Sequence, residues 1–162
     1  MDAITKTGEF DESKVLKTSA AEQERRNYEL KKGDFLFNTR NSRELVGKST
    51  LFPGGEGTVF NNNIMRIRFR PIVLPEYVAA AFQRPAIQGQ IESRKSGTTS
   101  VYAVYWRELK TVLIPVPPIE LQRAFVARIT EIDGLKSRYN IHLAKVDALF
   151  ASLQHRAFRG DL

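Results

Sequence analysis

Two short polar segments carry the side chains best suited to chemistry with a charged ligand. The first is Arg40-Asn41-Ser42-Arg43, and the second is residues 94–100 (RKSGTTS). Both place guanidinium or ammonium groups beside amide and hydroxyl groups, the combination that contacts phosphates and the edges of nucleic-acid bases. Two solvated surface loops would have the same composition, and these residues alone leave that alternative open.

Patterns that would indicate a catalytic or metal site are incomplete. Residues 46–50 (VGKST) imitate the end of a phosphate-binding loop, but position 42 is Ser where the pattern needs Gly, and no helix can follow because a Pro-Gly-Gly turn intervenes. The Glu-x-Lys tail of magnesium-dependent nuclease sites occurs three times, yet the chain has no Pro-Asp dipeptide to complete one. With no cysteine and two histidines, a Cys-ligated or multi-His metal site is excluded. We therefore expect no catalytic residues, no metal and no cofactor.

The positive charge is concentrated in the middle of the chain. The 162 residues include 25 Lys and Arg against 18 Asp and Glu, a net charge of +7. Residues 31–117 hold 13 basic and 6 acidic side chains, an excess as large as that of the whole chain. A polyanion such as nucleic acid would meet this excess, although a basic surface that only maintains solubility is an equal alternative.

The chain shows no signal for a membrane or for export. No apolar run approaches the ~20 residues that span a bilayer, and the first six residues, Met-Asp-Ala-Ile-Thr-Lys, lack the apolar core of a signal peptide. We therefore expect a cytoplasmic protein without a membrane partner.

The elements that would position the polar segments are short strands and one helix. We expect strands at residues 35–38, 46–52, 58–69 and 112–116, a helix at 76–93, and a strand or turn at 101–109. In the third strand, Arg66, Arg68 and Arg70 alternate with Ile and Phe, which predicts a half-buried strand with a cationic outer face. The first thirty residues are expected to be weakly structured.

After Pro118 the period of the apolar residues changes to that of one long helix. Its apolar stripe consists of Leu121, Phe125, Ile129, Ile132, Leu135, Tyr139, Leu143, Val146, Phe150 and Leu153. The mean spacing of about 3.56 residues lies between those of a straight helix and a heptad coiled coil. A helix of roughly 38 residues would be about 57 Å long, too long to bury its stripe against its own small domain. We therefore expect it to pack on a partner helix, with Gly134 as the candidate position for a bend.

Four segments in this order resemble the target-recognition domain of type I restriction-modification specificity (S) subunits and the helix that follows it. They are residues 30–42 (LKKGDFLFNTRNS), 45–48 (LVGK), 96–99 (SGTT) and 113–122 (LIPVPPIELQ). The last is similar to the strand-to-helix junction that opens the long spacer helix of the family, and residues 157–162 (AFRGDL) resemble the segment that closes it. The resemblance covers nearly the whole chain.

The resemblance implies an α/β (α+β) target-recognition domain at residues 1–117, followed by a long C-terminal coiled-coil-forming helix at residues 118–162. In the family such a domain reads half of a bipartite DNA site, and the helix pairs antiparallel with its twin. The complete subunit has two such units and bridges two methyltransferase (M) subunits, which a restriction/translocase (R) subunit joins. This chain carries one unit and is expected to lack the first strands of the domain, beginning near the turn at residues 8–11. It therefore resembles a C-terminal portion or a truncated half-subunit.

Two functions of different classes are compatible with these features. The first is a non-catalytic specificity component that binds double-stranded DNA, with methylation and ATP-dependent cleavage residing in the M and R subunits. The candidate DNA-contacting residues are Arg40, Lys48, Arg94 and Lys95 for phosphates, with Asn41, Ser42, Thr98 and Thr99 for base edges or the groove. The candidate residues for helix pairing, with a partner subunit or in a homodimer, are Leu121, Phe125, Ile129, Ile132, Tyr139, Leu143, Val146, Phe150 and Leu153. The second is a coiled-coil protein-interaction module whose truncated recognition domain no longer binds DNA; a nuclease is a distant third.

Overall fold

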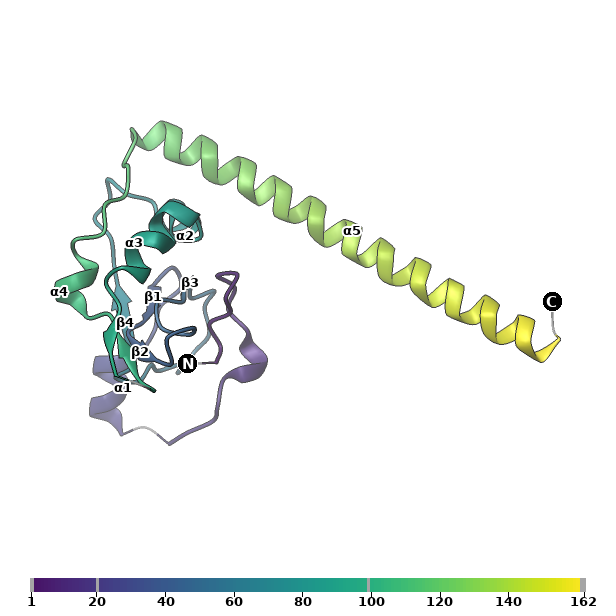
Figure 1. Ribbon diagram of the computed structural model, residues 1–162, viewed down its shortest axis with the longest axis horizontal. Coiled ribbons are helices and arrows are strands. Elements are labelled where there is room, and N and C mark those ends of the chain that lie inside the picture. Colours follow the sequence, from purple (N-terminus) through teal and green to yellow (C-terminus); the bar gives the residue numbers. More distant parts are fainter. Residues whose placement is uncertain (1, 20, 99, 161–162) are drawn as a thin grey trace. The chain divides into compact units, whose positions relative to one another are not determined.

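The computed structural model describes residues 2–19, 21–98 and 100–160, and the chain divides into two compact units (Figure 1). Unit 1, Met1–Gln122, holds the strands and the shorter helices. Unit 2, Arg123–Leu162, holds most of the long helix α5 (Ile119–Arg159). The expected fold class, a mixed α/β domain followed by a long C-terminal helix, is confirmed.

A three-stranded antiparallel sheet with the order β3-β1-β4 lies at the centre of unit 1. Its strands are β1 (Phe35–Asn38), β3 (Ser49–Leu51) and β4 (Ile64–Ile67). The first has the expected bounds, and the other two are shorter than expected. Phe35 of the central strand pairs with Leu51 on one side and with Ile67 on the other.

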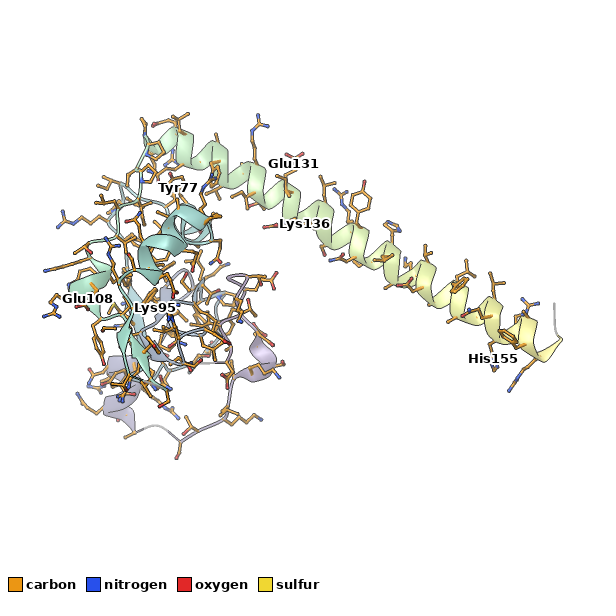
Figure 2. All side chains as sticks on the ribbon, in the orientation of Figure 1. Tyr77, Lys95, Glu108, Glu131, Lys136 and His155 are labelled. Carbon is orange, nitrogen blue, oxygen red and sulfur yellow. The ribbon has the colours of Figure 1, made fainter. Side chains whose placement is uncertain are left out.

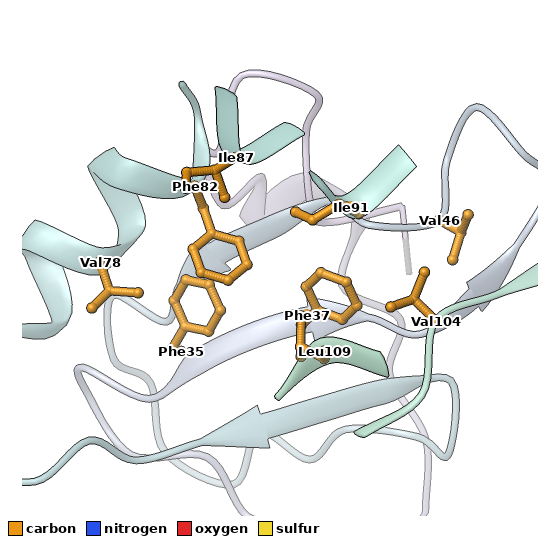
Figure 3. Packing of buried hydrophobic residues seen from close by; sticks show 9 residues of the cluster. All are labelled: Phe35, Phe37, Val46, Val78, Phe82, Ile87, Ile91, Val104 and Leu109. Carbon is orange, nitrogen blue, oxygen red and sulfur yellow. The ribbon is translucent and has the colours of Figure 1, made fainter. Parts of the chain in front are cut away.

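Alternation along β1 sends neighbouring side chains into two hydrophobic clusters, one on each face of the sheet. Phe35 and Phe37 face helices α2 (Pro75–Phe82) and α3 (Pro85–Glu92), and the ring of Phe82 packs edge-on against both (Figure 3). The second cluster, on the opposite face, consists of Ile4, Leu30, Leu36, Phe52 and Ile64. Because both faces are covered, all four residues of β1 are buried.

The N-terminal segment is more ordered than its sequence suggests. It contains the short helices η1 (Glu12–Lys14) and α1 (Glu22–Tyr28), and it covers one face of the sheet. Ile4 is 2% exposed, and an isolated bridge pairs it with Phe10. The hydroxyl of Thr50 on β3 donates to the carbonyl oxygen of Gly8 at 2.8 Å. The expectation of a weakly structured first thirty residues is therefore wrong for its core-forming part.

The helix expected over residues 76–93 is two helices in the structure. Helix α2 ends at Phe82 and α3 begins at Pro85. Proline has no N–H to continue a helical ladder, and it forces the preceding residue out of the helical region. Arg84 accordingly has an extended backbone (φ −78°, ψ 140°). The apolar periodicity of the sequence continues across this break, but the helical backbone conformation does not.

A second, smaller antiparallel sheet has the order β2-β6-β5. Its strands are β2 (Arg40–Asn41), β6 (Tyr102–Ala103) and β5 (Ser96–Gly97), and the short helix α4 (Trp106–Leu109) follows β6. No strand forms at residues 112–116, contrary to expectation. The side-chain amide of Gln90 takes the place of a neighbouring strand there, since it accepts from Leu113 N at 2.9 Å and donates to Leu113 O at 3.0 Å.

Helix α5 spans 41 residues and continues through Gly134 without a break. In its first turn Gln122 is fully buried within unit 1 and hydrogen-bonds to three backbone groups there. In unit 2 the apolar stripe is exposed in the single chain, with Tyr139 70% and Val146 61% exposed. Among the helices of the described residues, none is both long enough and apolar enough to cross a membrane.

Candidate nucleic-acid interface

The second sheet brings the two polar segments of the sequence together. Arg40 pairs with Ala103 and Asn41 with Tyr102, while Ser96 and Gly97 pair with the same two residues from the other side. Strand β6 thus lies between β2 and β5, although 54 residues separate the end of β2 from the start of β5 in the sequence. Thr98 follows β5 directly and is exposed. Thr99, also a predicted DNA contact, lies outside the described residues.

An open hollow of about 520 Å³ lies beside this sheet. Its lining comes from the end of β2, from the connection before β4 and from the segment before β6, and consists of Arg40, Asn41, Ser42, Asn62, Asn63, Ser100 and Val101. One guanidinium, three carboxamides and two hydroxyls therefore surround it, with one aliphatic side chain. Among the described residues that line the hollow there is no carboxylate, so an anionic ligand would meet no repelling side chain from them.

Arg40 is the cation of the hollow that is available to a ligand. It is exposed, and within the described part of the chain its guanidinium has no ion pair or hydrogen bond. Asn41, beside it, is half-buried, and its Oδ1 accepts from Ser42 N at 2.8 Å, which fixes the turn that leaves β2. A free guanidinium next to an ordered amide suits contact with a phosphate at the edge of a groove.

Lys95 and Arg43 are instead held by a shared partner. Glu92 at the end of α3 forms ion pairs with Arg43 Nε (2.9 Å) and Lys95 Nζ (2.7 Å). Lys95 Nζ also donates to the carbonyl oxygen of Arg43 at 2.7 Å, and the Lys95 side chain is only 10% exposed. Lys95 is labelled in Figure 2. Hydrogen bonds from Lys95 and Arg43 lower the pKa of Glu92, so it stays ionised. This cluster fastens the segment after β2 to α3.

Arg94, another cation predicted to contact phosphates, is also held by internal hydrogen bonds. Its Nε donates to Thr111 Oγ1 at 2.7 Å, and its Nη1 donates to Gln90 O at 2.7 Å. A further bond joins Nη2 to Thr111 O at 3.0 Å. The guanidinium therefore joins α3 to the segment after α4. A phosphate contact by Arg94 or Lys95 would have to replace these internal bonds.

Lys48 lies apart from the hollow. It precedes β3 and lies near the N-terminal residues Asp2 and Lys6. Burial lowers the pKa of Lys48; Asp2 opposes this shift and Lys6 adds to it. The structure thus brings Arg40, Asn41 and Ser42 together with the neighbourhood of Thr98, but it does not bring Lys48 to the same place.

Two of the three arginines that alternate along β4 and its continuation, Arg66 and Arg68, make internal bonds, whereas Arg70 is exposed. Arg66 donates to Glu29 O at 2.7 Å and stacks over the ring of Phe60. Arg68 makes a two-point contact with Asp34, whose side chain is 3% exposed. Burial alone raises the pKa of Asp34, but the hydrogen bonds from Arg68 and Lys31 N outweigh it, so the pKa is lowered. The face that carries Arg66 is covered by the second hydrophobic cluster.

Comparisons with known proteins agree with the resemblance read from the motifs. No family model matches the chain. The EcoKI specificity subunit, from a type I restriction enzyme of Escherichia coli K12, is 26% identical over 164 residues, which cover 97% of this chain and 35% of that protein. The EcoBI specificity subunit of Escherichia coli is 27% identical over 95 residues, which cover 56% of this chain and 20% of that protein.

The chain is related to type I restriction specificity subunits. The family resemblance predicted from the sequence motifs is thereby confirmed. The chain spans about a third of the length of its EcoKI relative and a fifth of that of its EcoBI relative. No group of three or more His, Asp or Glu side chains suited to a metal ion occurs within the described residues.

Two residues of the hollow were not predicted from the sequence. Asn62 and Asn63 belong to the run Asn61-Asn62-Asn63, which precedes β4. The only available signal was three consecutive carboxamides in a turn, and turns are rich in Asn for conformational reasons alone. Only the pairing of β1 with β4 and the bonds from Thr39 to Asn63 O show that this turn lies beside Arg40.

Proposed function

We propose that this chain is a non-catalytic specificity component of a type I restriction-modification system, and that unit 1 contacts one half-site of duplex DNA. One observation carries the proposal in the structure: sheet β2-β6-β5 gathers two segments, distant in sequence, beside a hollow lined by a free Arg40 and polar uncharged groups. The relationship to two specificity subunits supports the same role.

In this proposal Arg40 contacts a phosphate at the rim of the hollow, and the amides and hydroxyls contact base edges. Asn41, Ser42 and Thr98 are the candidates that the described structure places near the second sheet, and Thr99 remains a candidate by sequence. Arg94 and Lys95 act mainly by holding the segments in position, because their donors are already occupied. Lys48 would contact DNA only outside the hollow.

The salt dependence of DNA binding tests this proposal. Each phosphate contact contributes about 0.9 to the slope of log Kobs against log salt concentration. Arg40→Ala should therefore make the slope shallower by about 0.9, with little change in the melting temperature. Arg84→Ala is the matched control, because Arg84 is an exposed arginine outside the hollow with no capping bond to lose. Equal slopes for the chain and for both variants would remove Arg40 from the interface.

Assembly through α5 is the second part of the proposal. The helix is about 62 Å long at 1.5 Å per residue, and its stripe is exposed from Leu121 (60%) to Leu153 (40%), apart from the half-buried Ile129. An apolar surface of this extent requires a partner, because soluble monomers rarely expose more than a few hundred Å² of contiguous apolar surface. We propose that the stripe pairs with the helix of a second copy or with an M subunit, through which the R subunit would join.

The alternative function is a coiled-coil interaction module that does not bind DNA. The exposed stripe favours it as strongly as it favours the first, because both require a helix partner. The two functions differ in unit 1. A chain that oligomerises through α5 but shows no salt-dependent affinity for duplex DNA would have the alternative function.

A further inference from the structure

The backbone of the turn that contains Asn62 and Asn63 is fixed to the strand that supplies Arg40. Asn63 O accepts from Thr39 N at 2.8 Å and from Thr39 Oγ1 at 2.9 Å. Thr39 is 5% exposed and links β1 directly to β2. Within the turn itself, Asn61 Oδ1 accepts from Asn63 N at 3.1 Å. The position of this turn relative to Arg40 is therefore set by buried hydrogen bonds.

The carboxamides of Asn62 and Asn63 have no such structural task. Asn61 uses its side chain in the turn, whereas no hydrogen bond to either of the next two side chains occurs among the described residues. Asn62 is exposed and Asn63 is half-buried, and both line the hollow. Two ordered backbone positions thus present two unoccupied amides beside a free guanidinium.

The chemistry of the lining fits one kind of base pair. A carboxamide offers one donor and one acceptor side by side, which match the N7 acceptor and N6 donor of adenine in the major groove. Val101, 39% exposed at the same hollow, offers the aliphatic contact that suits the methyl group of thymine. The described lining residues include no carboxylate that could accept from the cytosine amino group.

We propose that Asn62 and Asn63 read an A·T base pair from the major groove, with Val101 against the thymine methyl and Arg40 on the adjoining phosphate. This inference rests on the proposed function, since it names the specificity-determining residues and the base pair of the same surface. It adds a third segment to the two that the sequence motifs indicated.

The test begins with selection of binding sequences from a randomised DNA duplex by the full chain. Each selected adenine is then replaced by 7-deazaadenine, which lacks the N7 acceptor. The unmodified chain should lose about 10-fold in affinity at one adenine. Asn62→Ala and Asn63→Ala are measured on both duplexes, singly and together. The amide that makes the contact should show the same loss on natural DNA and no further loss on the 7-deaza duplex.

Asn27→Ala is the matched control, because Asn27 is an exposed asparagine of α1 outside the hollow. It should retain both the affinity and the 7-deaza penalty of the unmodified chain, and thermal melts should show that all variants are folded. Sequence-selective binding that Asn62→Ala, Asn63→Ala and the double variant leave unchanged overturns this inference and leaves the proposed function standing. Absence of any salt-dependent DNA binding overturns the proposed function, and this inference with it.

Discussion

Gln122, in the first turn of α5, is a fully buried polar residue that holds the start of the helix by three hydrogen bonds. Its Oε1 accepts from Leu74 N at 2.9 Å, and its Nε2 donates to Pro117 O at 2.8 Å and to Ile72 O at 3.1 Å. Each bond contributes about 0.5–1.5 kcal/mol net, and a buried group left without a partner costs more than its bond contributed. Ile72 is exposed, so water can replace that one bond. Gln122→Ala should therefore destabilise unit 1 by about 2–4 kcal/mol.

Unfolding followed by tryptophan fluorescence measures this effect, because Trp106 is the only tryptophan and lies in unit 1. The expected loss in melting temperature is roughly 8–16 °C, from about 4 °C per kcal/mol for a unit of this size. Gln122→Glu keeps the acceptor for Leu74 N but turns a carboxylate toward two carbonyl oxygens, so at neutral pH it should destabilise at least as much. Gln154→Ala, at an exposed position of α5, is the control and should shift the melting temperature by less than about 2 °C. A Gln122→Ala variant as stable as the control would refute the assigned role of these bonds.

Three further predictions follow from other parts of the molecule. Asp34→Asn should flatten the loss of stability in acid. The pKa of Asp34 is below its usual 3.8, so the contribution of Asp34 to stability is present above that value and is lost as the pH falls through the folded pKa. An unchanged acid profile in denaturant titrations would contradict this prediction. Gly97→Ala should weaken discrimination between DNA sequences more than the control Gly89→Ala does, because a Cβ at Gly97 would collide with Val101 O, whereas Gly89 is an open position of α3. Equal effects of the two variants in competition binding would argue against this prediction. Sedimentation equilibrium should show an assembly larger than 18.4 kDa at tens of micromolar. The variant with Ile132→Asp, Tyr139→Asp and Val146→Asp, which break the stripe at its centre, should be a monomer. A clean monomer of the unmodified chain would exclude self-pairing.

The elements that could be predicted are those whose signal is local. The strand at Phe35–Asn38 and the helix after Pro118 follow from residue type and period, and both are present. The helix expected at residues 76–93 is divided because the backbone constraint of Pro85 outweighs an apolar period that continues across it. The segment at residues 112–116 has the apolar, β-branched composition of a strand, but its backbone partner is the amide of Gln90, which no local pattern reveals.

The candidate site was predictable only in part, because its geometry depends on long-range pairing. The polar segments at Arg40 and Thr98 could be chosen by composition, and β6 brings their strands together. Composition does not distinguish a free cation from a bonded one: Arg40 has no ion pair among the described residues, whereas Lys95 is held by Glu92. Asn62 and Asn63 reach the hollow through the bonds between Asn63 O and Thr39, which join residues 24 positions apart.

Mapping of methylated DNA tests the central claim, that this chain supplies sequence specificity to a methyltransferase, most directly. The cognate M subunit is incubated with genomic DNA alone, with the chain, with its Arg40→Ala variant and with its Arg84→Ala variant, and methylated positions are located by sequencing. The claim predicts methylation at one defined sequence only when the chain is present, strongly reduced with Arg40→Ala and retained with Arg84→Ala. The same methylation pattern with and without the chain would contradict it.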